Sequence, residues 1–207
     1  MHTIKKIISL IIISLFIILH TQQVFSYSYS EGKNAYDNKN YAKAFRIWYL
    51  LSLDDDPQGI YGMGLLYKNG FDQLDPSCEY ALQYLASAEK SGINDASYEL
   101  GNIFEIGKLC KTDKNKALTY YEKAAKNNHL ESIIRLAESY ENGTLGVKDQ
   151  IKSCVYNDQA ANLGDAIGQY RSAKCYKYNK AGIRDFEKAI NLLETAVNQK
   201  IDISNDA

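Results

Sequence analysis

Two short stretches of the sequence match S-x-x-K, the pattern that carries the nucleophile in serine β-lactamases. They are Ser30 to Lys33 and Ser87 to Lys90. A β-lactamase also needs an S-D-N and a K-T-G element to complete its base and oxyanion site, and neither accompanies these serines. Because a four-residue pattern that fixes two common residue types carries little information, we predict no catalysis at either serine.

Histidine and carboxylate residues give no stronger prediction of chemistry. Only His129 lies outside the first 26 residues, so a Ser-His-Asp triad would have to use it, at the predicted end of a helix beside a turn. The run Asp54-Asp55-Asp56-Pro57 could hold a metal ion, but it is typical of a turn followed by a helix N-cap. We therefore expect no enzyme, no metal and no cofactor.

Composition and the first residues indicate an exported globular protein. Hydrophobic residues make up 45% of the chain, and 24 basic residues face 25 acidic ones, which argues against nucleic acid as a partner. Lys5 and Lys6 precede an apolar run over residues 7–19, shorter than the roughly 20 residues of a spanning helix. We predict a signal peptide over residues 1–26, with cleavage after Ser26, or alternatively after Ser28. An uncleaved anchor is the other alternative. The mature protein would be periplasmic or secreted, in a bacterium, without stable membrane insertion.

The rest of the chain repeats with a period close to 36 residues, the signature of a solenoid. A small residue recurs after each helical apolar stripe, in steps of 37, 36 and 36 residues, and an aromatic residue follows three positions later. Five such columns keep their register over four units. They are Gly64, Gly101, Ala137 and Ala173; Tyr67, Phe104, Tyr140 and Tyr176; Ala81, Ala117, Ser153 and Ala189; Tyr84, Tyr120, Tyr156 and Leu192; and Ala88, Ala124, Ala160 and Ala196.

Each unit is predicted to contain two helices. In the second unit, the first helix carries apolar residues at helical spacing and stops at Gly107, and the second begins after an N-cap at Asp113. The N-cap also repeats, at Ser77, Asp113, Asp149 and Asp185. Gly92, Asn128 and Gly164 end three of the second helices, at positions that tolerate a left-handed backbone.

These units define the expected domain organisation. Residues 27–56 read as a degenerate capping repeat, in which Tyr41 to Trp48 form the second helix and Glu31 to Asp37 a shortened first helix. Four repeats follow, over residues 57–93, 94–129, 130–165 and 166–200, and residues 201–207 form a tail.

Two motifs of the second repeat resemble those of a known family. Tyr98 to Gly107 resembles the Y-x-L-G-x-x-Y-x-x-G core of Sel-1-like repeats, relatives of the tetratricopeptide repeats. Asp113 to Ala125 resembles the D-x-x-K-A-x-x-Y-Y-x-K-A-A that follows that core. The resemblance covers about residues 30–200 and implies an all-α, right-handed superhelical solenoid whose concave face binds proteins. Ser172-Ala173 and Asn179 depart from the pattern, so we interpret the last unit as a degenerate cap.

The four cysteines are predicted to form two disulfides. The second helix of one unit and the first helix of the next form an antiparallel hairpin, with turns near Gly92 and Gly164. Residues that face each other across a hairpin lie at equal distances from its turn, which pairs Cys78 with Cys110 and Cys154 with Cys175. In the chain-entropy model each bridge contributes about 3–4 kcal/mol. A thiol redox site or a zinc site is the alternative, but the sequence has no C-x-x-C motif.

Two columns of the first helices vary where the core columns do not, and we interpret them as a partner-binding groove on the concave face. In the first repeat these columns hold Gly62 and Leu65. In the three repeats that follow they hold the candidate residues Glu99, Asn102, Arg135, Glu138, Arg171 and Lys174. This groove would run from apolar through acidic to basic, and would read a protein or peptide partner in one direction. Reversing the charges of Arg171 and Lys174 would then leave the fold intact.

Three alternatives to the groove remain open. The variable columns could be ordinary solvated positions, and the protein could be a structural envelope protein or an oligomeric scaffold. The resemblance adds a third, because some exported members of the family have been linked to β-lactam binding.

Overall fold

The computed structural model describes residues 27–71, 74–180, 182 and 184–199, and within these residues the regular structure is helical. The predicted signal peptide and C-terminal tail lie outside them. The helices are α2 (Tyr29–Asp37), α3 (Tyr41–Leu53), α4 (Pro57–Asn69), α5 (Cys78–Lys90), α6 (Asn94–Ile106), α7 (Lys114–Lys126), α8 (Leu130–Asn142), α9 (Gln150–Asn162), α10 (Ala166–Lys177) and α11 (Phe186–Asn198). The predicted all-α solenoid is confirmed.

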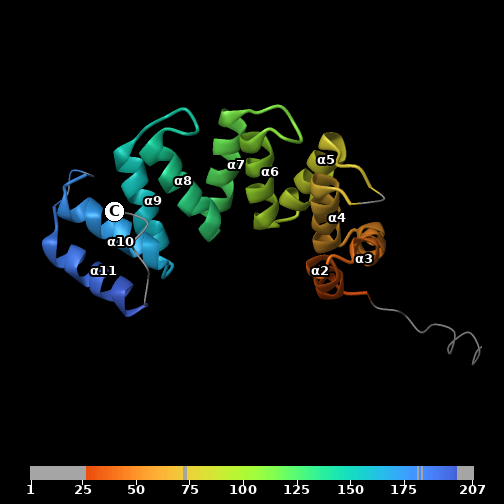
Figure 1. The fold of residues 1–207 in the computed structure, drawn as a ribbon, viewed down its shortest axis with the longest axis horizontal. Helices are drawn as coiled ribbons and strands as arrows, with labels where there is room; N and C mark the ends of the chain where they lie inside the picture. Colours follow the sequence, from red (N-terminus) through yellow and green to blue (C-terminus); the bar gives the residue numbers. More distant parts are fainter. Residues whose placement is uncertain (1–26, 72–73, 181, 183, 200–207) are drawn as a thin grey trace, which may run out of the picture.

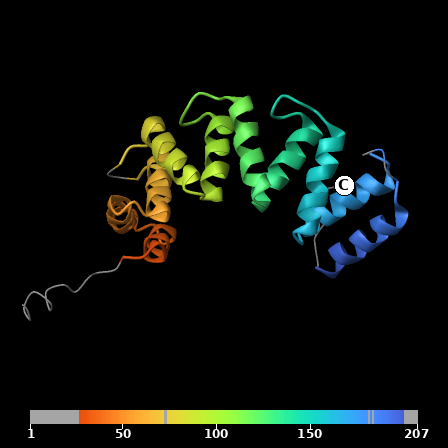
Figure 2. The same cartoon turned by 180° about the vertical axis from the view of Figure 1, so that it is seen from behind.

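The helices succeed one another as antiparallel pairs along an arc (Figure 1). We call α4, α6, α8 and α10 the A helices, and α5, α7, α9 and α11 the B helices. The connections from α6 to α7 and from α8 to α9 lie on the outer edge of the arc, and the view from behind shows the same order (Figure 2). Among the described helices, none has the length and apolar content needed to cross a membrane.

Polar caps set where the B helices begin, as the repeated N-cap predicts. The side chains of Ser77, Asp113, Asp149 and Asp185 each accept a hydrogen bond from the backbone N–H three residues later. Such a bond satisfies an N–H that has no partner inside the helix. Left-handed residues then close three B helices, at Gly92 (φ 90°), Asn128 (φ 59°) and Gly164 (φ 87°). Periodic caps therefore give the units their common length.

Each unit is held together by a small residue and an aromatic pair. Gly101 on α6 lies so close to Tyr121 on α7 that a Cβ atom there would be 2.5 Å from the Tyr121 ring. Three residues on, Phe104 stacks on Tyr120 with ring centroids 5.9 Å apart, and Tyr140 stacks on Tyr156 at 5.8 Å. A lysine of the B helix covers the A-helix ring in three units, at Lys116, Lys152 and Lys188.

Two disulfides add covalent links, with the pairing that the hairpin argument predicts. Cys78 at the start of α5 is joined to Cys110, which follows α6. Cys154 on α9 is joined to Cys175 on α10. Both bonds connect a B helix to the unit that follows it, so they strengthen the contact between repeats.

Candidate partner-binding surface

The candidate residues lie on the A helices, where charged side chains of consecutive units meet. The first such contact joins α4 to α6: Lys68 Nζ is 2.5 Å from Glu99 Oε2, and both side chains are mostly shielded from solvent. Asn102 lies one turn further along α6, 3.5 Å from the same carboxylate oxygen. The negative charge of Glu99 is therefore balanced by the positive charge of a lysine in the preceding unit.

Glu105 joins α6 to α8 and is the centre of the network. It accepts a hydrogen bond of 2.9 Å from Arg135 Nε and a second bond from Arg135 Nη2. The buried Tyr121 donates its hydroxyl to the same carboxylate at 2.7 Å, and that hydroxyl also lies 2.8 Å from Asn102 Oδ1. Bidentate pairs of this kind fix direction as well as charge.

The environment of Glu105 changes how it titrates. Burial by itself raises the pKa of the Glu105 carboxyl, but the hydrogen bonds from Arg135 and Tyr121 outweigh burial and hold that pKa below its ordinary value. The hydrogen bond to Glu105 likewise raises the pKa of Arg135, and burial raises that of Tyr121. At neutral pH the carboxylate and the guanidinium therefore stay charged.

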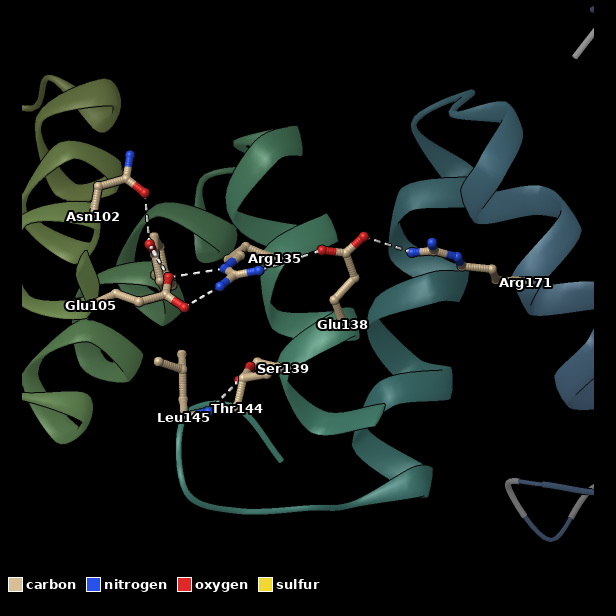
Figure 3. Close-up of polar contacts among 9 residues, drawn as sticks. Asn102, Glu105, Arg135, Glu138, Ser139, Thr144, Leu145 and Arg171 are labelled. Carbon is tan, nitrogen blue, oxygen red and sulfur yellow. Dashed lines mark hydrogen bonds and ion pairs between the residues drawn. The ribbon is translucent and has the colours of Figure 1, made fainter. Parts of the chain in front are cut away.

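Glu138 carries the row onward to α10. It lies 3.7 Å from Arg135 on its own helix and 3.1 Å from Arg171 on the next one. Figure 3 shows Asn102, Glu105, Arg135, Glu138 and Arg171 in one line across α6, α8 and α10. We call this line the polar row.

The predicted gradient from apolar through acidic to basic charge is wrong. Leu65 is buried, and Gly62 packs against the ring of Trp48. Glu99, Arg135 and Arg171 each meet an opposite charge on the preceding A helix. Because Arg171 is only 20% exposed and is paired with Glu138, the charge reversal Arg171→Glu would set two carboxylates side by side and destabilise the fold. The geometry of this pair therefore predicts a loss of stability in place of the unchanged fold expected from the sequence.

Sequence reasoning missed Lys68 and Glu105, although a signal for them exists. Three of the ion pairs described join successive A helices, and their residues are separated by 31, 30 and 33 positions, slightly less than one repeat. Opposite charges at that offset on successive A helices would have identified the pairs. A search for conserved or variable columns alone compares positions one full period apart and cannot find them.

A polar cavity of about 290 Å³ lies at the α10 end of the polar row. Its lining carries both charges. The acidic residues are Glu138 and Glu141, and the basic residues are Arg171, Lys174 and Lys180. Cys175, and thus the Cys154–Cys175 disulfide, forms part of the lining. The cavity brings together three of the six candidate residues. Asn102 lines a smaller cavity of about 210 Å³ beside Lys68 and Ile106.

An Asp-His-Ser arrangement does occur around His129, but it caps a helix. His129 Nε2 is 3.3 Å from Asp95 Oδ1, and Nδ1 is 3.2 Å from the Ser132 hydroxyl. Nδ1 also accepts from the Ser132 backbone N–H, which makes His129 the N-cap of α8, and its ring stacks on Tyr98. Ser132 is 0% exposed, so its hydroxyl cannot reach a substrate.

The other chemistry candidates have structural roles or lie on open surface. Ser30 contacts the Ser28 hydroxyl, while Lys33 pairs with Asp37. Ser87 and Lys90 are exposed on α5. Asp56 is the N-cap of α4, as predicted. Within the described residues, no group of three or more His, Cys, Asp or Glu side chains could hold a metal ion.

Comparisons with solved structures place this arrangement among known folds. A protective antigen present in uropathogenic Escherichia coli strains, which displays an SLR fold, matches with a TM-score of 0.73 and 22% identity over 85% of this chain. This chain covers 38% of the length of that antigen. A Sel1 repeat protein from Oxalobacter formigenes matches with a TM-score of 0.67 and 21% identity, covering 89% of this chain and 78% of the other. At these identities the similarity establishes the fold.

Comparison at the level of sequence gives the family. No curated protein matches the chain, but the Sel1 repeat family model matches residues 57–93, 94–129, 130–165 and 166–200. Sel1 repeat proteins are generally protein-interaction scaffolds, and their fold is typically non-catalytic. With four matching units over most of its length, the chain belongs to the Sel1 repeat family.

Proposed function

We propose that this protein is an exported scaffold that binds a protein or peptide partner on the A-helix side of the solenoid, the side expected to be concave. The observation that carries the proposal is the polar row that ends in a cavity with walls of both charges. Its side chains are partly exposed yet held in place by each other. Groups that are ordered before binding lose less entropy on binding.

Complementary charge would give such a surface its selectivity. Glu138 and Glu141 lie beside Arg171, Lys174 and Lys180 around one cavity. A partner segment with one acidic and one basic side chain would meet both, and would fit in one direction only. The candidate residues Glu99, Asn102, Arg135, Glu138, Arg171 and Lys174 thus form the proposed interface, with the cavity as its most specific part.

Export is part of the proposal and has separate support. Residues 1–26 have the composition of a signal peptide. The two disulfides are compatible with an oxidising compartment such as the periplasm or the exterior. No catalytic role is included, because neither S-x-x-K serine lines one of the cavities described above and the Ser132 hydroxyl is buried.

The binding surface can be located with a photo-crosslinking amino acid in the exported protein. Glu141 is a suitable position, because it lines the cavity and its weak contact with Lys180, at 3.9 Å, is easily lost. Ser87, which is exposed on a B helix, serves as the control. We expect a covalent partner from position 141 and none from position 87. Partner capture only from position 87 would place the interface on the B helices, and no capture from either would favour a structural or oligomeric scaffold.

A matched pair of variants then tests the charges themselves. Glu138→Gln with Arg171→Gln removes the Glu138–Arg171 ion pair and the longer Glu138–Arg135 contact, while Arg135 keeps its pair with Glu105. Lys33→Gln with Asp37→Asn removes an exposed ion pair on α2. Removing both partners together leaves no buried charge unpaired, so both proteins should keep their melting temperatures within a few degrees. Only the first variant should lose partner capture. Equal capture by both variants would exclude the polar row as the interface.

A further inference from the structure

The last described helix, α11, presents an apolar stripe to solvent. Phe186, Ile190 and Val197 are 57%, 55% and 65% exposed, and Leu193 between them is half-buried. Their spacing of 4, 3 and 4 residues places them on one face of the helix. Figure 1 shows α11 at the end of the arc, after α10. We call these four residues the α11 stripe.

In the preceding unit the same columns are covered by the next A helix. Cys154 and Ala161 on α9 lie 36 residues before Ile190 and Val197, and they are 3% and 7% exposed. Cys154 is bonded directly to Cys175 of α10. The α11 stripe therefore continues the contact surface between repeats. Arg184 lies over the ring of Phe186, 5.7 Å from its centroid, but no helix among the described residues covers the stripe.

A carboxylate beside the stripe repeats in the same way. Asp158 on α9 accepts hydrogen bonds from the hydroxyls of Tyr176 and Ser172 on α10. One unit earlier, Glu122 on α7 accepts from Tyr140 on α8 at 3.0 Å. Glu194 on α11 occupies this column, 36 residues after Asp158. Within the described part of the chain it is exposed and makes no side-chain hydrogen bond or ion pair, and neither does Glu187 one heptad before it.

The opposite end of the solenoid is built differently. The outward side of α2 carries Ser30, Lys33, Asn34 and Asp37, all exposed, with an ion pair of 2.6 Å between Lys33 and Asp37. A polar outer face is what the terminal repeat of a solenoid needs for solubility. Helix α11 differs from α2 in that it keeps the apolar columns of an internal repeat, and the interpretation of the last unit as a cap stays a prediction.

We propose that the α11 stripe docks a basic amphipathic helix of a partner protein, which takes the place of the next A helix. The apolar side of that helix would cover Ile190, Leu193 and Val197. A tyrosine hydroxyl or a basic side chain would reach Glu194, as Tyr176 reaches Asp158 inside the solenoid. This surface is separate from the polar row, so the two proposals stand or fall independently.

Charge is the reason to infer a basic partner rather than a second copy of this chain. Stacking α11 on the α2 end of another copy would set the apolar stripe against a polar face. Pairing two α11 helices antiparallel about the midpoint of Ile190 and Leu193 would bring Glu187 of one copy close to Glu194 of the other. Like charges beside a helix–helix seam are unfavourable. A helix with Lys or Arg at those positions meets both carboxylates.

The chain itself supplies a probe of this chemistry. A synthetic peptide of residues 166–177 with Cys175→Ala keeps Tyr176 and the basic residues Arg171, Lys174 and Lys177. A side-chain lactam on its solvent side would hold it helical, since a free peptide of this length is marginal in water. The isotope-labelled protein is titrated with this peptide and observed by NMR. We expect shifts that are concentrated on α11, with weak, fast-exchanging binding, because one helix buries little area.

Variants with matched changes decide whether the stripe is the site. Ile190→Asp and Glu194→Lys each alter an exposed position, so the protein should remain folded, and each should weaken peptide binding by about tenfold or more. The peptide with Tyr176→Phe should bind less tightly to the unaltered protein, and the exposed substitution Asn34→Asp on α2 should leave peptide binding unchanged.

Shifts that map elsewhere, or none at millimolar peptide, would overturn the proposal. So would a dimer that Ile190→Asp dissociates, which would assign the stripe to a second copy. Changed α11 signals in a chain ending at Gln199 would assign it to residues 200–207.

Discussion

Replacing Gly101 by alanine tests whether the small-residue column exists to admit the ring of Tyr121. The added Cβ atom would lie 2.5 Å from Tyr121 Cε1 and 2.6 Å from Cδ1. An aromatic ring cannot bend away as a flexible chain end can, and Tyr121 is fully buried. Either α6 and α7 separate, or the ring turns and its hydroxyl leaves Glu105 and Asn102.

The competing free-energy terms decide the sign. Alanine is favoured over glycine within a helix by about 0.5–1 kcal/mol. Overpacking costs about 1–3 kcal/mol, and losing a hydrogen bond to a charged group such as Glu105 costs about 1.5–3 kcal/mol. We therefore expect a net destabilisation of about 2–4 kcal/mol. For a domain of this size, that corresponds to a melting temperature lower by roughly 5–15 °C.

Thermal unfolding followed by circular dichroism measures this effect, and a double-mutant cycle isolates its cause. In the third unit the corresponding positions hold Ala137 and Asn157. In a Tyr121→Asn background, Gly101→Ala should therefore be neutral or slightly stabilising, and the coupling between the two sites should be large. If Gly101→Ala leaves the unaltered protein as stable or makes it more stable, the steric explanation of the column is refuted.

Four further predictions follow from the fold and the site. Leu100→Ala should destabilise the protein by about 2–5 kcal/mol as a core truncation, measured by denaturant unfolding, since Leu100 is 1% exposed. Because the folded pKa of Glu105 lies below its ordinary value of 4.5, its stabilising contribution is complete above that value and is lost as the pH falls through the folded pKa. Glu105→Gln should thus lower stability at pH 7 and flatten the loss of stability in acid, and an acid limb identical to that of the unaltered protein would contradict this. Cys154→Ser with Cys175→Ser should lower the free energy of unfolding by about 3 kcal/mol, and a non-reducing peptide map should show these two cysteines joined; free thiols in the native compartment would refute both the bond and the oxidising location. The exported protein should begin at Tyr27, which intact-mass measurement can check.

The sequence was sufficient to predict the fold, because every level of the pattern repeats. Ser77, Asp113, Asp149 and Asp185 cap helices where their spacing predicts it. Caps act on backbone groups within one helical turn, so they can be read locally. The cysteine pairing was also predictable. Once the hairpin turns are known, positions at equal distances from a turn must lie opposite each other.

The proposed interface could be predicted only in part. The candidate columns do lie on the A helices, and Glu138, Arg171 and Lys174 line one cavity. The predicted gradient of charge along these residues was wrong, because each residue was considered without its ion-pair partner. An ion pair depends on two side chains within about 4 Å, and here the partners come from different units, as with Glu105 and Arg135.

Sequence and tertiary structure thus determine different properties of this protein. Periodic small residues, caps and aromatics determine the helices and their pairing, since these interactions span one turn or one hairpin. Only the packing of units against each other decides which charges remain available, because the offset and tilt between stacked A helices bring positions 30–33 residues apart into contact. The same packing explains the exposed stripe on α11. Ile190 and Val197 occupy columns that are buried in the preceding unit, and they stay in water because none of the described residues follows α11 in the stack.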